Sequence, residues 1–152
     1  MRIALYQPDQ AGNVGTIIRL GACMGVGVHI IEPCGFPFSD RALKRAGMDY
    51  TDLAAVTRHE SWDAFLAELP GRLVLFTTTA AVRLPDARFE AHDTLLMGSE
   101  SRGAPEEVHA RADLRVRIPQ VQDTRSLNIA VAAGIGLAEA MRQTGWQGTG
   151  TS

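Results

Sequence analysis

Cysteine is scarce in this sequence. Only Cys23 and Cys34 occur in 152 residues, and their spacing matches neither a zinc site nor a disulfide framework. The sequence therefore predicts a reduced, cytoplasmic protein with no structural metal. Long hydrophobic runs are also missing: the longest stretch of small and apolar residues, 129–138, is well short of the ~20 residues that span a bilayer. The start, MRIALYQPDQ, lacks the apolar core of a signal peptide, so we expect no membrane contact.

Lysine is almost absent as well. Lys44 is the one lysine among 15 basic residues, and all the others are arginines. The net charge of −2 argues against a globally basic protein that coats DNA, so we expect no DNA partner. Two explanations of the arginine content stay open, namely a GC-rich genome and the recognition of phosphate groups. In RALKRAG, Arg41, Lys44 and Arg45 would form one cationic side of a short helix, either solvated or in contact with RNA phosphates.

Segments typical of buried strands alternate with helical segments along the chain. We predict strands at 2–7, 27–33, 53–59, 72–79, 93–98 and 114–119, and helices at 12–25, 41–47, 61–69, 105–111 and from about 129 to 143. Ser61 is the expected N-cap of its helix, and Pro105 marks another helix start. The alternation predicts one α/β domain over residues 1–152, with a mostly parallel sheet flanked by helices and a flexible tail at about 144–152.

The last predicted helix contains two glycines, Gly134 and Gly136, which should each cost roughly 1 kcal/mol relative to alanine. We therefore expect another part of the structure to lie very close to the helix backbone at both positions. Polar residues gather just before this helix, at Ser126 and Asn128.

Ligands of parallel α/β sheets bind outside the carboxyl ends of the strands, so the strand-to-helix junctions are the expected positions of a site. Three junctions are candidates for this site, with the sequences QPDQAGNVGTIIRL, LLMGSESRGAPEE and IPQVQDTRSLNIA. None contains a Walker phosphate loop or the dinucleotide fingerprint, which disfavours the common nucleotide-binding folds.

These junctions resemble the motifs of a known family. GNVGTIIRL, GSESRG and IPQVQDTRSLNIA are similar, in order, to the three motifs of the SPOUT (trefoil-knotted) RNA methyltransferases. HIIEPCGFPFSD, RALKRAGMDY and AVTRH resemble one subgroup, the small tRNA 2′-O-methyltransferases that act on the wobble nucleotide, cytidine or uridine 34. The resemblance extends from residue 1 to about residue 143. It implies a SPOUT fold with a C-terminal trefoil knot, S-adenosylmethionine as cofactor, tRNA as substrate and a homodimer.

The resemblance also implies roles for individual residues. The cofactor-binding positions would be Phe76, Thr77, Gly98, Ile118, Ser126 and Leu127. The catalytic positions would be Arg19, Ser126 and Asn128. The substrate-binding positions would be Asn13, Arg41, Lys44, Arg45, Glu100, Arg102 and Gly103.

Arg19 would bind the phosphate beside the attacked ribose and stabilise the charge that develops on the 2′-oxygen. A free guanidinium is a poor base, so the general base stays unidentified. No histidine occurs in the three motifs, and we expect His29 and His59 to have structural roles or to lie at the rim of the site.

The chain departs from the family pattern in two places. The family commonly has Asn-Leu-Ser where this chain has Asn128-Ile129-Ala130, and it often has a late aromatic residue where this chain has Ala138. Both changes leave RNA selectivity open. Two alternatives therefore remain: a 2′-O-methyltransferase of the same fold for another tRNA or rRNA position, and a non-catalytic dimer that binds RNA or nucleotides. In either case Gly134 and Gly136 would reflect close packing in the knot or across the dimer.

Overall fold

The computed structural model describes residues 1–45 and 55–146. Its strands are β1 (Arg2–Tyr6), β2 (Gly27–Ile31), β3 (Val56–His59), β4 (Leu73–Phe76), β5 (Val82–Arg83), β6 (Thr94–Met97) and β7 (Leu114–Arg117). Its helices are α1 (Ala11–Met24), α2 (Asp40–Arg45), α4 (Trp62–Ala67), α5 (Glu106–Arg111) and α6 (Ile129–Thr144), with a 3₁₀ turn at Leu84–Asp86. Every predicted strand and helix is present, while β5 and the 3₁₀ turn were not predicted. Parts of the predicted segments 41–47 and 53–59, and most of the predicted tail, lie outside the described residues.

The strands form one seven-stranded sheet in the order β3-β2-β1-β6-β4-β7-β5. All pairings between these strands are parallel, which confirms the predicted sheet type. β1 has β2 on one side and β6 on the other, so the strand order reverses there. Such a switch point leaves a crevice at the carboxyl ends of the strands, where ligands bind in this class of fold. The C-terminal trefoil knot stays a prediction.

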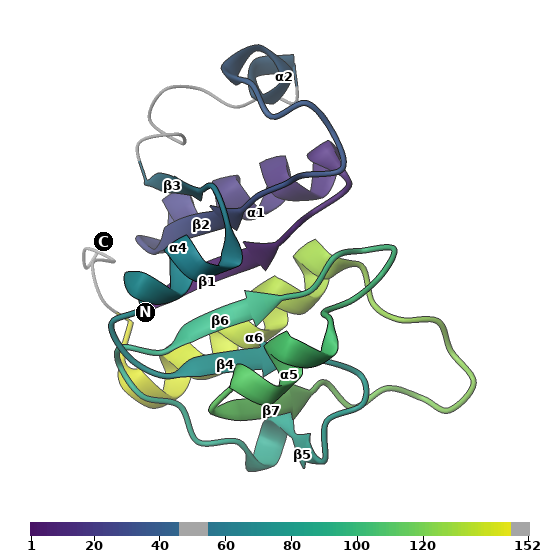
Figure 1. The fold of residues 1–152 in the computed structure, drawn as a ribbon. Coiled ribbons are helices and arrows are strands. Elements are labelled where there is room, and N and C mark those ends of the chain that lie inside the picture. Colours follow the sequence, from purple (N-terminus) through teal and green to yellow (C-terminus); the bar gives the residue numbers. More distant parts are fainter. Residues whose placement is uncertain (46–54, 147–152) are drawn as a thin grey trace.

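The helices cover the two sides of the sheet (Figure 1). α1 and α6 lie side by side on one side, where Ile17 and Leu137 join the larger buried cluster. α4 and α5 lie on the other side, where Phe65 and Val108 belong to a second cluster. Ser61 caps α4 as predicted, because its hydroxyl accepts a hydrogen bond of 3.1 Å from the backbone N–H of Ala64. The four central strands β1, β2, β4 and β6 are buried between these layers, which explains their mostly apolar sequences.

The two glycines of α6 have different surroundings. A Cβ atom at Gly136 would lie 2.6 Å from the ring of Phe76, so only glycine lets the helix approach this side chain of β4. A Cβ atom at Gly134 would meet nothing within 4 Å. The prediction of a close contact is therefore right at Gly136, although the neighbour is a side chain rather than backbone. At Gly134 it is wrong within this chain, because this position of the helix faces away from the sheet. Neither α6 nor any other helix among the described residues is long and apolar enough to cross a membrane.

Candidate active site

A pocket of about 390 Å³ opens at the carboxyl ends of β4, β6 and β7, beside the switch point of the sheet. Its walls come from the three junctions that resembled family motifs and from the end of β4 with the residues that follow it. The lining residues are Gln10, Asn13, Phe76, Thr77, Thr78, Met97, Gly98, Ser99, Glu100, Gly103, Ala104, Val116, Ile118, Gln120, Ser126, Leu127, Asn128, Ile129 and Ala132. The volume is within the range of pockets that enclose small organic ligands.

The loop after β6 folds back on itself at the floor of the pocket. Ser99 and Gly103 exchange two backbone hydrogen bonds of 3.0 and 2.8 Å. A Cβ atom at Gly98 would lie 2.7 Å from the carbonyl carbon of Gly103 and 2.8 Å from the nitrogen of Ala104. Gly98 is thus required by this tight turn, in which Gly103 itself has a φ of +67°. The turn keeps the backbone of the pocket floor uncovered by side chains.

Asp9 fastens this loop to the end of β1. Its carboxylate accepts hydrogen bonds from the hydroxyl of Ser99 at 3.0 Å, from the backbone N–H of Ser101 at 3.3 Å and from the hydroxyl of Ser101. The backbone N–H of Asp9 in turn donates to Oε2 of Glu100 at 2.8 Å. The bond from the Ser101 hydroxyl is the main reason why the pKa of Asp9 is lowered to about 2. Asp9 is therefore a fixed negative charge at neutral pH.

The pKa of Glu100 is shifted in the opposite direction from that of Asp9. Burial is the largest effect on its carboxyl group and raises its pKa. Its Oε1 atom is buried and has no hydrogen-bond partner among the described residues. A buried oxygen without a partner is unfavourable, so a ligand that brings a donor to this oxygen would be stabilised.

Three amide side chains connect the start of α6 to the start of α1. The Asn128 side-chain NH₂ donates to Oδ1 of Asn13 at 2.9 Å, and the Asn13 side-chain NH₂ donates to Oε1 of Gln10 at 3.1 Å. Asn128 also caps α6, since its Oδ1 accepts from the backbone N–H groups of Ala130 at 2.8 Å and Val131 at 3.3 Å. This chain explains the polar residues that precede an otherwise apolar helix: they hold the two helix starts beside the pocket.

The apolar wall of the pocket is positioned by packing behind it. Phe76, the last residue of β4, lies against Gly136 and stacks on Phe89 with ring centroids 6.4 Å apart. Ile118 follows β7 directly and packs against the same buried cluster.

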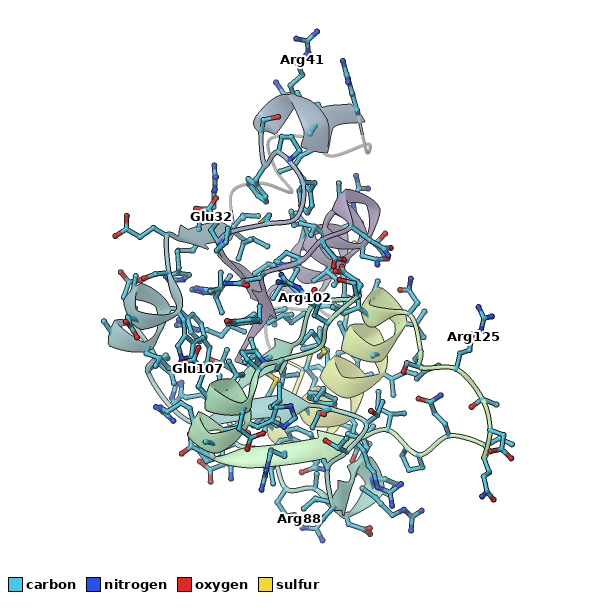
Figure 2. The ribbon with its side chains drawn as sticks, turned by 45° about the vertical axis from the view of Figure 1, so that its right-hand side comes forward. Glu32, Arg41, Arg88, Arg102, Glu107 and Arg125 are labelled. Carbon is cyan, nitrogen blue, oxygen red and sulfur yellow. The ribbon has the colours of Figure 1, made fainter. Side chains whose placement is uncertain are left out.

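The structure brings together most of the residues predicted for the site. Ten of them line the pocket: Asn13, Phe76, Thr77, Gly98, Glu100, Gly103, Ile118, Ser126, Leu127 and Asn128. Five do not line it: Arg19 lies on the exposed side of α1, Arg102 on the exposed turn after β6, and Arg41, Lys44 and Arg45 on α2. Figure 2 shows Arg41 on α2, far from Arg102. Their predicted roles therefore depend on an RNA or a second subunit reaching the pocket from outside.

Sequence reasoning missed Asp9 and Gln10, although both belong to the first junction. The available signal was their position directly after a buried strand, where polar side chains face the crevice. The other unpredicted lining residues, such as Thr78 and Gln120, carry no comparable pattern in the sequence.

Comparison with known proteins agrees with this geometry. The SpoU rRNA Methylase family matches residues 1–138. The tRNA (cytidine(34)-2'-O)-methyltransferase of Beijerinckia indica is 56% identical over 146 residues, which cover 94% of this chain and 91% of that protein.

Two solved structures share the fold closely. One comes from work described as structural insights into the 2-OH methylation of C/U34 on tRNA. It has a TM-score of 0.86 and 44% identity, and the match covers 93% of this chain and 94% of that chain. The SpoU methyltransferase AviRb from Streptomyces viridochromogenes, solved in complex with the cofactor AdoMet, has a TM-score of 0.80 and 25% identity, over 94% of this chain and 57% of that chain. From the family match over residues 1–138 and this agreement in fold, we conclude that the chain belongs to the SpoU rRNA methylase family.

Proposed function

We propose that this chain is a cytoplasmic enzyme that transfers a methyl group from S-adenosylmethionine to the ribose 2′-oxygen of the tRNA wobble nucleotide, cytidine or uridine 34. The observation that carries the proposal is the pocket of about 390 Å³ in which all three motif loops meet. The relative from Beijerinckia indica, 56% identical, carries this activity in its name.

The pocket residues suit S-adenosylmethionine. Phe76, Ile118 and Leu127 offer an apolar wall for the adenine ring. The bare turn at Gly98 lets backbone groups reach the ligand, and the buried Oε1 of Glu100 offers an acceptor to one of its donors. When bound, the cofactor supplies an electrophilic methyl group on a positively charged sulfur.

The remaining pocket residues hold the reacting groups in place. Asn128 fixes the start of α6 through its cap and through Asn13, so both loops keep one geometry. Ser126 lines the pocket on the same loop, and its hydroxyl would offer a polar contact to the methionine part of the cofactor. Thr77, after β4, would offer a second polar contact. Holding two reactants in line is a major source of rate enhancement in such a transfer.

Arg19 supplies the positive charge for the transfer. Its guanidinium binds the phosphate next to the attacked ribose and stabilises the negative charge on the 2′-oxygen. Because Arg19 does not line the pocket of its own chain, it serves the pocket of a second copy.

A homodimer accounts for this arrangement and for the outer side of α6. Val131 and Ile135 are 49% and 39% exposed, and the exposed Ala138 continues the same row. Gly134, whose Cα has open space beside it, allows a partner helix to approach closely. α1 packs beside α6, so a partner on this surface would also lie close to α1 and Arg19.

The RNA contacts extend from the pocket to the surface outside it. Arg41, Lys44 and Arg45 on α2 bind phosphates of the anticodon stem, while Arg102 and Gly103 hold the nucleotide at the mouth of the pocket. Asn13 and Glu100 contact the ribose from inside.

Ribose methylation of tRNA tests the proposal. Mass-spectrometric mapping should show that a deletion strain loses the 2′-O-methyl group at nucleotide 34 and regains it when the gene is restored. Loss at another tRNA or rRNA position would favour the same-fold alternative. Unchanged methylation everywhere would favour a non-catalytic RNA-binding dimer.

A further inference from the structure

Two arginines face each other at one edge of the sheet. Arg83 in β5 and Arg117 in β7 are Cα partners in the parallel pairing of these strands, so their side chains leave the sheet on the same side. Arg115 lies two residues before Arg117 and shares that side, because side chains alternate along a strand. Val116 lies between them and is buried on the other side, in the cluster that α1 and α6 cover. We refer to Arg83, Arg115 and Arg117 as the edge arginines.

The edge arginines form no ion pair and no side-chain hydrogen bond within residues 1–45 and 55–146. Some arginines elsewhere in the described residues are paired, as Arg72 is with Asp93 and Arg111 with Asp113. Like charges directly opposite each other weaken a strand pair, and β5 has only two residues. An anion from outside the chain would offset this repulsion.

The position of the edge arginines indicates the kind of anion. Val116 and Ile118 line the pocket, so Arg117 between them points away from any ligand inside it. β5 and β7 nevertheless end, at Arg83 and Arg117, on the same side of the sheet where the pocket opens. A polyanion with one nucleotide in the pocket can continue over this edge and bring its phosphates to the guanidinium groups. The planar fork of arginine binds phosphate through two parallel hydrogen bonds.

We infer that the edge arginines bind the sugar–phosphate backbone of the tRNA substrate, outside the cofactor pocket. The inference rests on the proposed function for the identity of the RNA. Figure 1 shows α2 and β5 at opposite ends of the molecule, so the cationic side of α2 and the edge arginines flank the pocket. Neighbouring strands lie about 4.8 Å apart, which makes a seven-stranded sheet roughly 30 Å wide. RNA that meets both surfaces is thus held over several nucleotides.

The salt dependence of tRNA binding tests the inference. Arg83→Gln and Arg117→Gln together remove two charges and keep polar side chains. Fluorescence anisotropy over a series of salt concentrations should show roughly tenfold weaker binding, and a slope of log K against log[salt] that is smaller by about 1.5, since each lost phosphate contact removes ~0.7–0.9. The control for charge, Arg88→Gln with Arg111→Gln, removes the same charge at two exposed positions and should change the slope by less than half as much. Calorimetry should show unchanged S-adenosylmethionine binding in both.

Thermal unfolding gives a second readout. Relief of the repulsion should leave the Arg83→Gln, Arg117→Gln variant with a Tm equal to or above that of the wild type. A Tm below that of the wild type would show that the two arginines stabilise the fold, and a salt slope equal to the control's would show that they do not bind RNA. Either result overturns the inference. If the wild-type protein methylates tRNA and the Arg83→Gln, Arg117→Gln variant has the wild-type salt slope, this inference alone is refuted. If the wild-type protein leaves tRNA unmethylated, the proposed function is refuted.

Discussion

A single carboxylate, that of Asp9, joins two of the three loops that build the pocket. Asp9→Ala would release the loop at 99–101, and we expect S-adenosylmethionine to bind about tenfold more weakly, which corresponds to about one charge-assisted hydrogen bond. Asp9→Asn should lose less, because the amide oxygen still accepts a hydrogen bond. Calorimetry measures the S-adenosylmethionine affinity of both variants. Ser61→Ala is the control: it removes the cap of α4, costs ~1 kcal/mol of stability and should leave cofactor affinity unchanged. Equal cofactor affinity in Asp9→Ala and the wild type would contradict the prediction.

Arg19 should affect the reaction and not the cofactor. Removing one well-placed charge stabiliser typically costs ~10²–10³ in rate, so Arg19→Ala should almost abolish methyl transfer to tRNA in a single-turnover assay. Cofactor binding should survive, because Arg19 does not line the pocket. Arg19→Lys should recover little activity, since a point charge does not reproduce the guanidinium fork. Near-normal turnover in Arg19→Ala would mean that another group stabilises the 2′-oxygen.

Between elements, the pairing of β2 with β3 buries two histidines against each other. Nδ1 of His29 lies 2.8 Å from Nε2 of His59, with the rings stacked and both side chains buried, as a structural role requires. Burial is the main cause that lowers the pKa of His29 to about 4, and nearby Arg2 and His59 add to it. Burial also lowers the pKa of His59, against the opposing effect of Glu68.

This pair should make the β2–β3 edge sensitive to acid. The unfolded chain takes up a proton near pH 6.5 and the folded chain only near pH 4, so the stability contributed by neutral His29 is complete above pH 6.5 and is lost as the pH falls towards 4. At pH 5 the loss is on the order of 2 kcal/mol. Chemical unfolding at pH 7.5 and pH 5 measures this loss in the free energy of unfolding. His29→Gln should reduce the difference, and replacement of the exposed His92 should not. Identical unfolding midpoints at both pH values would rule the effect out.

Local sequence signals predicted most of the elements. Apolar runs such as 73–76 and 94–97 became central strands, and the polar residues Ser61 and Asn128 became N-caps because their side chains replace missing backbone partners. β5 was missed because two residues carry no periodic pattern. The role of Gly136 needed the structure, since its neighbour Phe76 is sixty residues away in the sequence and no local pattern connects them. Asp9 was missed for the same reason: its partners belong to another loop.

For the whole molecule, the position of Arg19 outside its own pocket predicts complementation between subunits. Gly98→Val should close the pocket, because even a Cβ atom there collides with the backbone of Gly103. Mixed after partial unfolding and reassembly, Arg19→Ala and Gly98→Val subunits should regain about a quarter of wild-type activity, as half of randomly paired dimers hold one intact site. Each variant alone should be inactive. No recovery in mixed dimers verified by mass spectrometry would place Arg19 in its own subunit's site, and a stable, active monomer in sedimentation would exclude the dimer.

The hydrogen bond between Asn128 and Asn13 joins residues 115 positions apart in the sequence, and this separation matters while the nascent chain is being synthesised. A ribosome makes β1, β4 and β6 long before it makes α6, so the emerging chain first carries an uncovered apolar surface where Ala133, Leu137 and Met141 will later pack. The pocket residues at 126–132 are synthesised with the same late segment. A growing or truncated chain therefore has no complete binding site to offer. Binding of the small ligand therefore requires that the last helix has docked on the sheet.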